Sequence, residues 1–104
     1  MNSKIKIYDV ALEHFVASLE KSTVAKVLRT IDLLEEFGHR LGMPHSKKVA
    51  PQLFELRTRG AQEVRIFYTF HQGDVILLLH GYVKKSRTIP HRELTLALQR
   101  LKCV

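Results

Sequence analysis

Charged residues lie at alternate positions in two strand-like segments of the sequence. Glu55 and Arg57 belong to QLFELRT (residues 52–58), and Arg65 belongs to EVRIFYTF (residues 63–70). Side chains alternate between the two faces of a strand. If the purely apolar faces pack on helices, Glu55, Arg57 and Arg65 share the opposite face of the sheet. A charge in a buried strand is costly unless it is paired or faces water, so these residues are candidates for a functional site or for an internal ion pair.

Further basic residues flank these strands and predict a basic concave face. Lys47 and Lys48 precede the first strand, and Arg59 follows it. The end of a third strand and the segment after it add Lys84, Lys85, Arg87 and Arg92.

The net charge of +7 is distributed unevenly along the chain. Residues 1–39 hold five Lys/Arg and six Asp/Glu, whereas residues 40–104 hold twelve Lys/Arg and four Asp/Glu. Their net charges are therefore −1 and +8. Such an asymmetry favours a polyanion partner such as nucleic acid, although a basic soluble surface without a partner gives the same pattern.

Each charged residue also has a purely structural interpretation. Arg65 and Glu55 can form a cross-strand ion pair without further function. Arg57 and Arg59 can be solvated charges that protect a sheet edge from aggregation. Lys84 and Lys85 can simply be the solvated end of a strand.

The sequence contains no sign of a metal or a cofactor. There is no Gly-rich phosphate loop and no recognisable Ser-His-Asp arrangement. His80 can be a buried histidine with a satisfied hydrogen bond rather than a base. The other histidines lack the spacing of metal ligands, which argues against zinc; they are His14, His39, His45, His71 and His91.

The hydrophobic pattern predicts the elements that must position these residues. Residues 9–20 have apolar positions at helical spacing, and a second helix is expected from the cap candidates Ser22 and Thr23 to a stop at Gly38. The two helices should form an antiparallel hairpin. Residues 39–51, which contain one glycine and two prolines, are interpreted as a loop with a turn of helix at its start.

Three strands should follow and form an antiparallel meander over residues 52–58, 63–70 and 74–84, with a hairpin at HQGD. On strict alternation, Ile76, Leu78, His80, Tyr82 and Lys84 share one face of the third strand. Pro90 should lie in the first turn of a C-terminal helix. Ile5 and Ile7 predict a short extra edge strand. The fold class is therefore α+β, with a helical hairpin packed on one face of a small sheet.

The length suits one domain over residues 1–104. No apolar run is long enough for a membrane span, and the N-terminus lacks a secretory signal. Cys103 is the only cysteine, so an intrachain disulfide is impossible and the cytoplasm is the expected compartment.

Three blocks of the sequence together resemble a known family. LFELR, the pattern R-x-F-Y starting at Arg65, and LLHG-x-x-KK ending at Lys85 are similar to the phage Gp49-like branch of the RelE/ParE toxins, often called HigB. The similarity runs from about Leu33 to Leu101 and implies the same RelE-like fold. Such proteins are toxins of bacterial type II toxin–antitoxin modules. RelE-like and HigB-like members cleave mRNA in the ribosomal A site, and ParE-like members poison DNA gyrase.

The resemblance implies a metal-independent ribonuclease in which the RNA 2′-hydroxyl attacks the neighbouring phosphate. Arg65 would contact that phosphate, and Arg57 would hold phosphate or brace Glu55. Lys84 and Lys85 would stabilise the phosphorane or protonate the leaving oxygen. Lys47 and Lys48 would bind backbone phosphates, and we expect Arg59, Arg87 and Arg92 to extend this nucleic-acid-binding surface.

The identity of the general base stays open between Glu55, His80 and a lysine. The expected partners are a cognate HigA-type antitoxin, mRNA in the ribosomal A site and the ribosome with its 16S rRNA. The protein would act in the cytoplasm of a bacterium, whether encoded there or by a phage. Two alternatives are a gyrase inhibitor that acts by protein binding and a non-toxic module of antitoxin type or with RNA-binding function.

Overall fold

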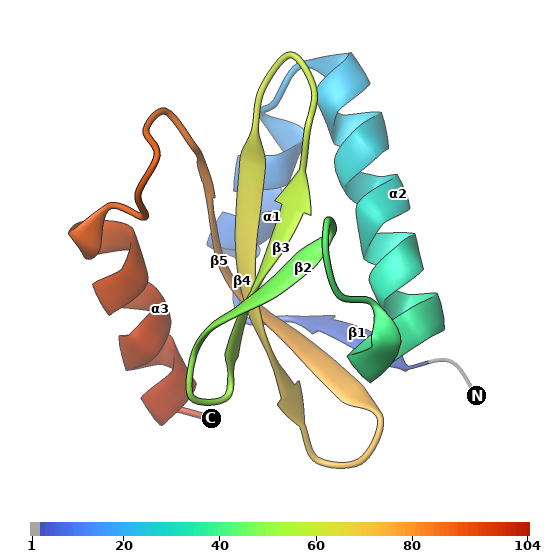
Figure 1. Ribbon diagram of the computed structural model, residues 1–104, viewed down its shortest axis with the longest axis vertical. Helices are drawn as coiled ribbons and strands as arrows, with labels where there is room; N and C mark the ends of the chain where they lie inside the picture. The colour runs from blue at the N-terminus through green and yellow to red at the C-terminus, as the bar shows by residue number, and fades with distance from the viewer. Residues whose placement is uncertain (1–2) are drawn as a thin grey trace.

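The computed structural model describes residues 3–104. These residues form three α-helices, one 3-10 helix and five strands (Figure 1). The order is β1 (Lys4–Ile7), α1 (Val10–Ala17), α2 (Lys21–Phe37), η1 (Gly38–Arg40), β2 (Ser46–Ala50), β3 (Leu53–Thr58), β4 (Val64–His71), β5 (Val75–Val83) and α3 (His91–Lys102).

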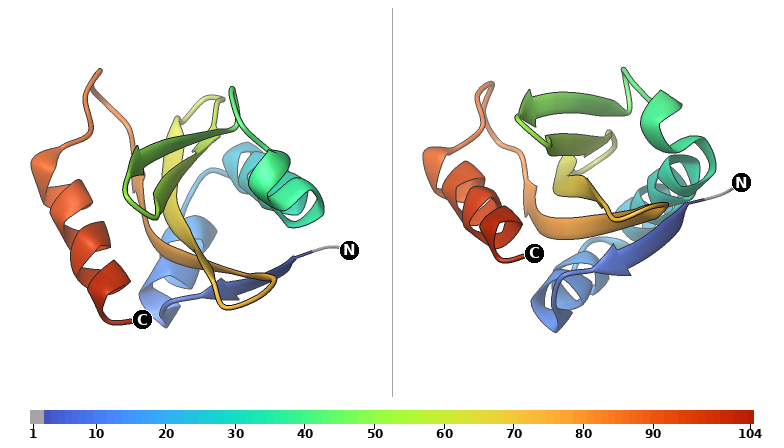
Figure 2. Two further views of the ribbon diagram at one scale, coloured as in Figure 1. Left: turned by 60° about the horizontal axis from the view of Figure 1, so that its bottom comes forward. Right: turned by 90° about the horizontal axis from the view of Figure 1, so that it is seen from below.

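The five strands form one sheet in the order β1-β5-β4-β3-β2. β3, β4 and β5 are the predicted antiparallel meander, and β1 is the predicted edge strand, which runs parallel to β5. α1 packs on β5 and α2 packs on β3, whereas α3 packs on β5 from the other side of the sheet (Figure 2). The expected α+β fold with a helical hairpin on one face is therefore confirmed.

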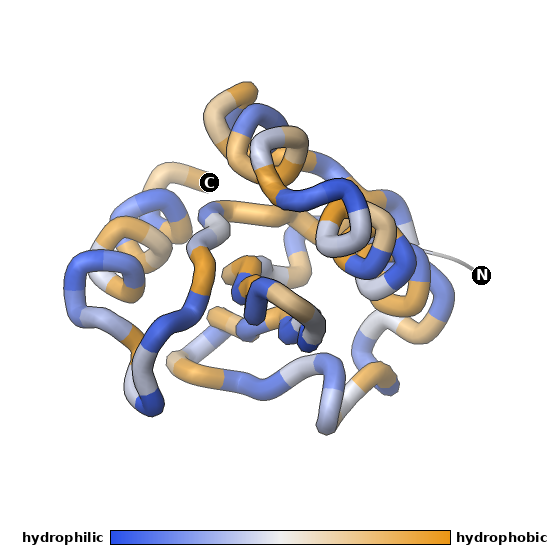
Figure 3. The backbone as a smooth tube through the Cα atoms, turned by 90° about the horizontal axis from the view of Figure 1, so that it is seen from above, coloured by the Kyte–Doolittle hydropathy of each residue, from blue (hydrophilic) through white to orange (hydrophobic). Residues whose placement is uncertain are grey.

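The helices are amphipathic, and hydrophobic and hydrophilic stretches alternate along their turns in Figure 3. Leu12, Val27 and Leu34 from the hairpin are buried against Ile66 and Leu78 of the sheet. This burial of apolar area is the main stabilisation of the fold.

A second, smaller core lies on the opposite face of the sheet. Ala97 of α3 packs there with Leu53, Phe67, Leu79 and Tyr82. Both faces of the sheet are thus partly covered, and the charged residues of β3 and β4 lie beside the second core.

The helix boundaries differ slightly from those expected. α1 begins after the N-cap Asp9, whose carboxylate accepts a 3.1 Å hydrogen bond from the Leu12 N–H, and it ends at Ala17. The prediction that Ser22 or Thr23 caps the second helix was wrong, because the helix already begins at Lys21. Gly38 ends α2 as predicted, with a φ of +53° that suits glycine.

The prediction of a loop over residues 39–51 was also wrong in part, because Ser46–Ala50 forms β2 at the edge of the sheet. Gly42, Pro44 and Pro51 surround this short strand and hide it in the sequence. The edge strand pairs on one side only, with β3.

The prediction that side chains alternate strictly between the two faces along β5 was also wrong. The register shifts between Phe67 and Tyr68 of β4, which lie opposite His80 and Leu78 respectively, so Leu79 is an extra residue on β5. Such a β-bulge reverses the facing of everything beyond it. Leu78 therefore packs with the hairpin core, whereas Tyr82 packs with the α3 core.

Candidate functional site

Arg65 is the second residue of β4, and its side chain is only 2 % exposed. It lies directly opposite Arg57 on β3 and Tyr82 on β5. Its Nε is 3.8 Å from Glu55 Oε1, close enough for charge attraction but without a hydrogen bond. Its Nη1 donates a 3.3 Å hydrogen bond to the Val64 carbonyl. The guanidinium is therefore fixed in place while part of its donor capacity remains unused.

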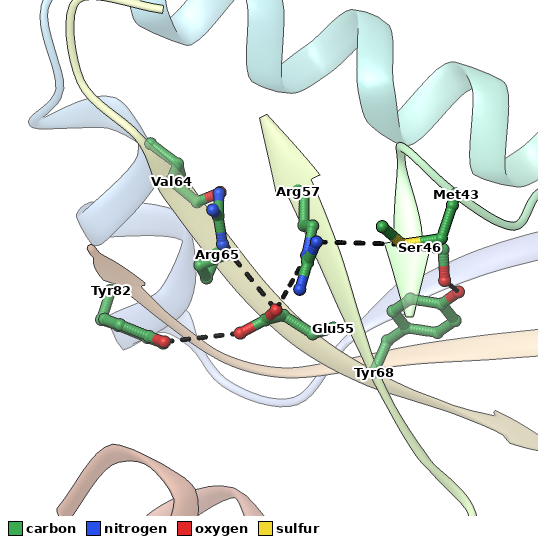
Figure 4. A network of polar contacts seen from close by, with 8 residues as sticks. All are labelled: Met43, Ser46, Glu55, Arg57, Val64, Arg65, Tyr68 and Tyr82. Carbon is green, nitrogen blue, oxygen red and sulfur yellow. Dashed lines mark hydrogen bonds and ion pairs between the residues drawn. The ribbon is translucent and has the colours of Figure 1, made fainter. Parts of the chain in front are cut away.

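Glu55 is the common acceptor of this network (Figure 4). Its side chain is 1 % exposed, and Arg57 Nε donates a 3.1 Å hydrogen bond to Oε1. The Tyr82 hydroxyl donates to Oε2 at 3.4 Å. A buried carboxylate is stable only when it is paired, and here both oxygens have partners. Two arginines and one carboxylate leave this cluster with a formal charge of +1.

Burial and, after it, the nearby Glu55 carboxylate raise the pKa of Tyr82 to about 12. The Arg65 guanidinium opposes this shift in the pKa. The Tyr82 hydroxyl therefore keeps its proton at neutral pH and serves as a donor to Glu55.

One end of the sheet carries a pocket of about 500 Å³ that we call the basic pocket. It is lined by Arg59, Glu63, Arg65, Lys84, Lys85, Ser86 and Arg87. Lys84 is fixed at its backbone, where its N–H donates a 2.7 Å hydrogen bond to the Glu63 carbonyl. Arg59, Lys85 and Arg87 are exposed, so solvated cations surround a fixed and buried one. The structure thus brings together five of the basic residues predicted from the sequence.

Lys47 and Lys48 lie on β2 and point to opposite faces of the sheet, because side chains alternate along a strand. Lys47 is opposite Glu55, on the face that carries Arg65, whereas Lys48 is opposite Phe54 and lines a pocket with Tyr68 on the hairpin side. Both lysines are exposed. Only Lys47 shares a face with the buried charge cluster.

His80 and Arg92 lie outside the basic pocket. His80 Nε2 is 2.7 Å from Glu93 Oε1 on α3, and the His80 ring stacks parallel to Phe67 with the ring centroids 6.4 Å apart. His80 therefore has a partner that holds it against α3. Arg92, at the start of α3, is 90 % exposed, and its Nη2 is 3.9 Å from Glu93.

Tyr82 and Glu63 were not predicted as site residues. Tyr82 could have been found, because it lies two residues before Lys84, but the bulge at Leu79 hides which face it occupies. Glu63 lines the basic pocket, is half-buried and forms no ion pair among residues 3–104. Of the two carboxylates of the site, Glu55 is therefore buried and paired, whereas Glu63 is half-buried and forms no ion pair within residues 3–104.

The hairpin side of β4 carries a separate polar contact. The Tyr68 and Ser46 hydroxyls form a short, buried hydrogen bond, also drawn in Figure 4. Burial raises the pKa of Tyr68, and the hydrogen bond to Ser46 partly offsets the rise. Tyr68 is thus a core residue with a satisfied hydroxyl.

Residues 3–104 contain neither a cluster of metal ligands nor a membrane-spanning helix. No three side chains of His, Cys, Asp or Glu gather closely enough there to hold a metal ion. No helix in this range has the length and apolar character needed to cross a membrane.

Comparison with solved structures identifies the fold. A structure of E. coli toxin RelE, a mutant in the free state, matches with a TM-score of 0.69 over 97 % of this chain and 99 % of the RelE chain. The sequence identity is 12 %, so this likeness establishes the RelE-like fold alone. No curated protein sequence matches significantly.

Comparison with family models gives a match to the phage-derived protein Gp49-like family over residues 14–102. This range covers most of the chain and contains the charge cluster and the basic pocket. The resemblance seen in LFELR, R-x-F-Y and LLHG-x-x-KK is thereby confirmed, and the chain belongs to the Gp49-like family of phage-derived proteins, with a RelE-like fold.

Proposed function

We propose that this protein is the toxin of a type II toxin–antitoxin module and acts as a ribosome-dependent mRNA endoribonuclease. Membership of the Gp49-like family and the RelE-like fold support a toxin. The observation that carries the ribonuclease assignment is the buried Arg65 in the wall of the basic pocket.

The basic pocket suits a phosphoryl group. Preorganised cations that face developing negative charge often contribute more to catalysis than any other effect. Arg65 is held by Glu55 and by the Val64 carbonyl, so it needs little reorganisation when a phosphate arrives. The other cations of the pocket add positive charge around the same space; they are Arg59, Lys84, Lys85 and Arg87.

In the proposed reaction the 2′-oxygen of one nucleotide attacks the adjacent phosphorus. The bond from phosphorus to the 5′-oxygen of the next nucleotide breaks, and a 2′,3′-cyclic phosphate forms. Arg65 stabilises the charge on the non-bridging oxygens. Lys84 or Lys85 gives a proton to the 5′-oxygen. The reaction needs no metal in this scheme, because the cations supply the charge stabilisation.

The environments of the carboxylates suggest different roles for them. Both oxygens of Glu55 accept hydrogen bonds, which favours a positioning role for Glu55 and its neighbour Arg57. Glu63 lines the basic pocket and forms no ion pair within residues 3–104, so we assign it as the proton acceptor for the 2′-hydroxyl. His80 is engaged by Glu93 and lines a different pocket.

The proposed partners follow from this function. A cognate antitoxin, of the HigA type, would hold the toxin inactive. The substrate would be mRNA in the ribosomal A site, and the exposed Lys47, Lys48 and Arg92 would contact RNA phosphates of the mRNA or of 16S rRNA. The site of action would be the bacterial cytoplasm.

The test is brief induction of wild type, Arg65→Ala and the exposed control Arg40→Ala in bacteria, followed by primer extension of cellular mRNAs. We expect cuts within translated frames for wild type and Arg40→Ala, and none for Arg65→Ala. Growth arrest by all three proteins with intact mRNA would contradict the proposal. Accumulated gyrase–DNA breaks in that case would identify a gyrase inhibitor instead.

A further inference from the structure

A second pocket lies between α2 and β3, beside the basic pocket. It has a volume of about 260 Å³, and we call it the α2–β3 pocket. Lys26 and Arg29 of α2 line it from one side, and His45, Arg57 and Arg59 line it from the other. Four basic residues and a histidine from three separate segments therefore line one small space.

Three of these cations have no acidic partner within the part of the chain that the structure describes. Within residues 3–104, Lys26, Arg29 and Arg59 form no ion pair, whereas Arg57 is shared with Glu55. The Lys26 ammonium reaches across the β3–β4 loop, where a Cβ on Gly60 would lie 3.0 Å from Nζ. The basic residues that line the pocket therefore make its rim strongly positive. The Lys26 ammonium is held close to the β3–β4 loop.

The uncharged part of the lining of the α2–β3 pocket, which we call its floor, is largely apolar. Leu33 and Pro44 line it, together with Thr30 and Thr58. The threonine hydroxyls are already used, since Thr58 donates to Thr30 at 3.1 Å and Thr30 donates to the Lys26 carbonyl at 2.8 Å. A cationic rim above an apolar floor suits a nucleotide, with its phosphate on the rim and its sugar or base on the floor.

The two pockets adjoin each other across β3. Arg59 lines both pockets, and Arg57 of the α2–β3 pocket lies directly opposite Arg65 of the basic pocket. In Figure 1 the β3–β4 loop lies between the β5–α3 segment and the first turns of α2. Positive charge thus extends from one pocket to the other across this end of the sheet.

We propose that the α2–β3 pocket binds a phosphodiester group of RNA, next to the one that reacts in the basic pocket. This inference rests on the proposed function, which it extends with a second binding subsite. The phosphate can belong to the mRNA itself, close to the cut, or to ribosomal RNA beside the A site. In both cases Lys26 and Arg29 bind RNA without taking part in the chemistry.

The test measures cleavage by the full-length protein on ribosomes programmed with a defined mRNA. The variant is the double substitution Lys26→Ala/Arg29→Ala, and the control is Lys21→Ala/Arg40→Ala, which removes the same charge from exposed positions outside both pockets. All four side chains are exposed, so both variants should fold, which circular dichroism checks.

We expect the Lys26→Ala/Arg29→Ala variant to raise KM and leave kcat within about twofold of wild type, because the pocket lies away from the reacting atoms. The dependence of log KM on log salt should become shallower by roughly 0.7 for each phosphate of single-stranded RNA that the variant no longer neutralises. The control should match wild type in both respects.

Neutral methylphosphonate linkages, placed singly around the cut, identify the source of the phosphate. A penalty at one mRNA position that disappears in the Lys26→Ala/Arg29→Ala variant assigns the phosphate to mRNA. A raised KM that couples to no mRNA position assigns it to ribosomal RNA.

An unchanged KM and salt slope in the Lys26→Ala/Arg29→Ala variant would overturn the inference while the proposed function stands. Normal cleavage by that variant with lost neutralisation by the antitoxin would overturn it in favour of an acidic peptide ligand. If wild type itself cleaves no RNA, the proposed function fails and this inference with it.

Discussion

Replacement of Glu55 by glutamine tests whether the buried charge cluster is organised as described. The substitution preserves shape and removes the carboxylate that lies between Arg57 and Arg65. The cost arises at Arg65, which is 2 % exposed and would keep its charge without a counterion. Arg57 is better able to tolerate the loss, because it is 14 % exposed and lies nearer to water.

The expected size of this effect follows from buried ion pairs. Removal of one partner of a buried pair costs about 3–5 kcal/mol. The glutamine carbonyl can still accept a hydrogen bond from one arginine, so we expect a loss near the lower limit, about 3 kcal/mol. For a domain of this size that lowers Tm by roughly 10–20 °C and leaves a folded protein at room temperature.

Urea denaturation followed by far-ultraviolet circular dichroism measures the loss, since the chain has no tryptophan for fluorescence. The exposed control Glu36→Gln should change stability by less than about 0.5 kcal/mol. The double variant Glu55→Gln/Arg65→Met removes the stranded charge and should recover at least about 1 kcal/mol relative to the sum of the single changes. A Glu55→Gln loss below about 1 kcal/mol, the value of an exposed pair, would refute the reasoning.

Three further outcomes are expected. Because the pKa of Tyr82 is raised from 10.0 to about 12, the folded state holds the hydroxyl proton more tightly than the unfolded state does. The stability that the protonated hydroxyl contributes is complete well below pH 10 and is lost as the pH rises through about 12. Wild type should therefore lose roughly 2 kcal/mol more than Tyr82→Phe between about pH 10 and pH 12 in urea titrations, and parallel curves would contradict the assignment. Gly81→Ala should destabilise by about 1–3 kcal/mol, because the new Cβ would lie 2.8 Å from Phe15 Cε2; Phe15→Leu should recover part of the loss, and a neutral Gly81→Ala would show that the ring moves freely. Glu63→Gln should lower kcat at neutral pH without unfolding the protein, whereas an unchanged kcat would exclude Glu63 as the proton acceptor.

The fold could be predicted from the sequence where its periodicity is strong. The helical hairpin, the three-strand meander and the C-terminal helix each carry a clear pattern of apolar residues. β2 could not be found, because it is five residues long and is enclosed by Gly42, Pro44 and Pro51. The bulge at Leu79 was also invisible, since a run such as VILLL is apolar on both faces and does not reveal its own register.

The candidate site could be predicted to a similar extent. Alternation correctly placed Glu55, Arg57 and Arg65 on one face, because no bulge intervenes between them. The contribution of Lys26 and Arg29 could not be predicted, because it depends on how α2 packs across β3. The partner of His80 was hidden for the same reason, since Glu93 comes from a helix that returns over the sheet.

The most direct test of the central claim is cleavage of a ribosome-bound mRNA by the purified protein, with a ribose or a 2′-deoxyribose at the nucleotide that is cut. We predict cleavage of the ribose substrate to a 2′,3′-cyclic phosphate, no cleavage of the 2′-deoxy substrate, and no cleavage of either by Arg65→Ala. Cleavage of the 2′-deoxy substrate, or full activity of Arg65→Ala, would contradict an attack by the 2′-hydroxyl that Arg65 assists.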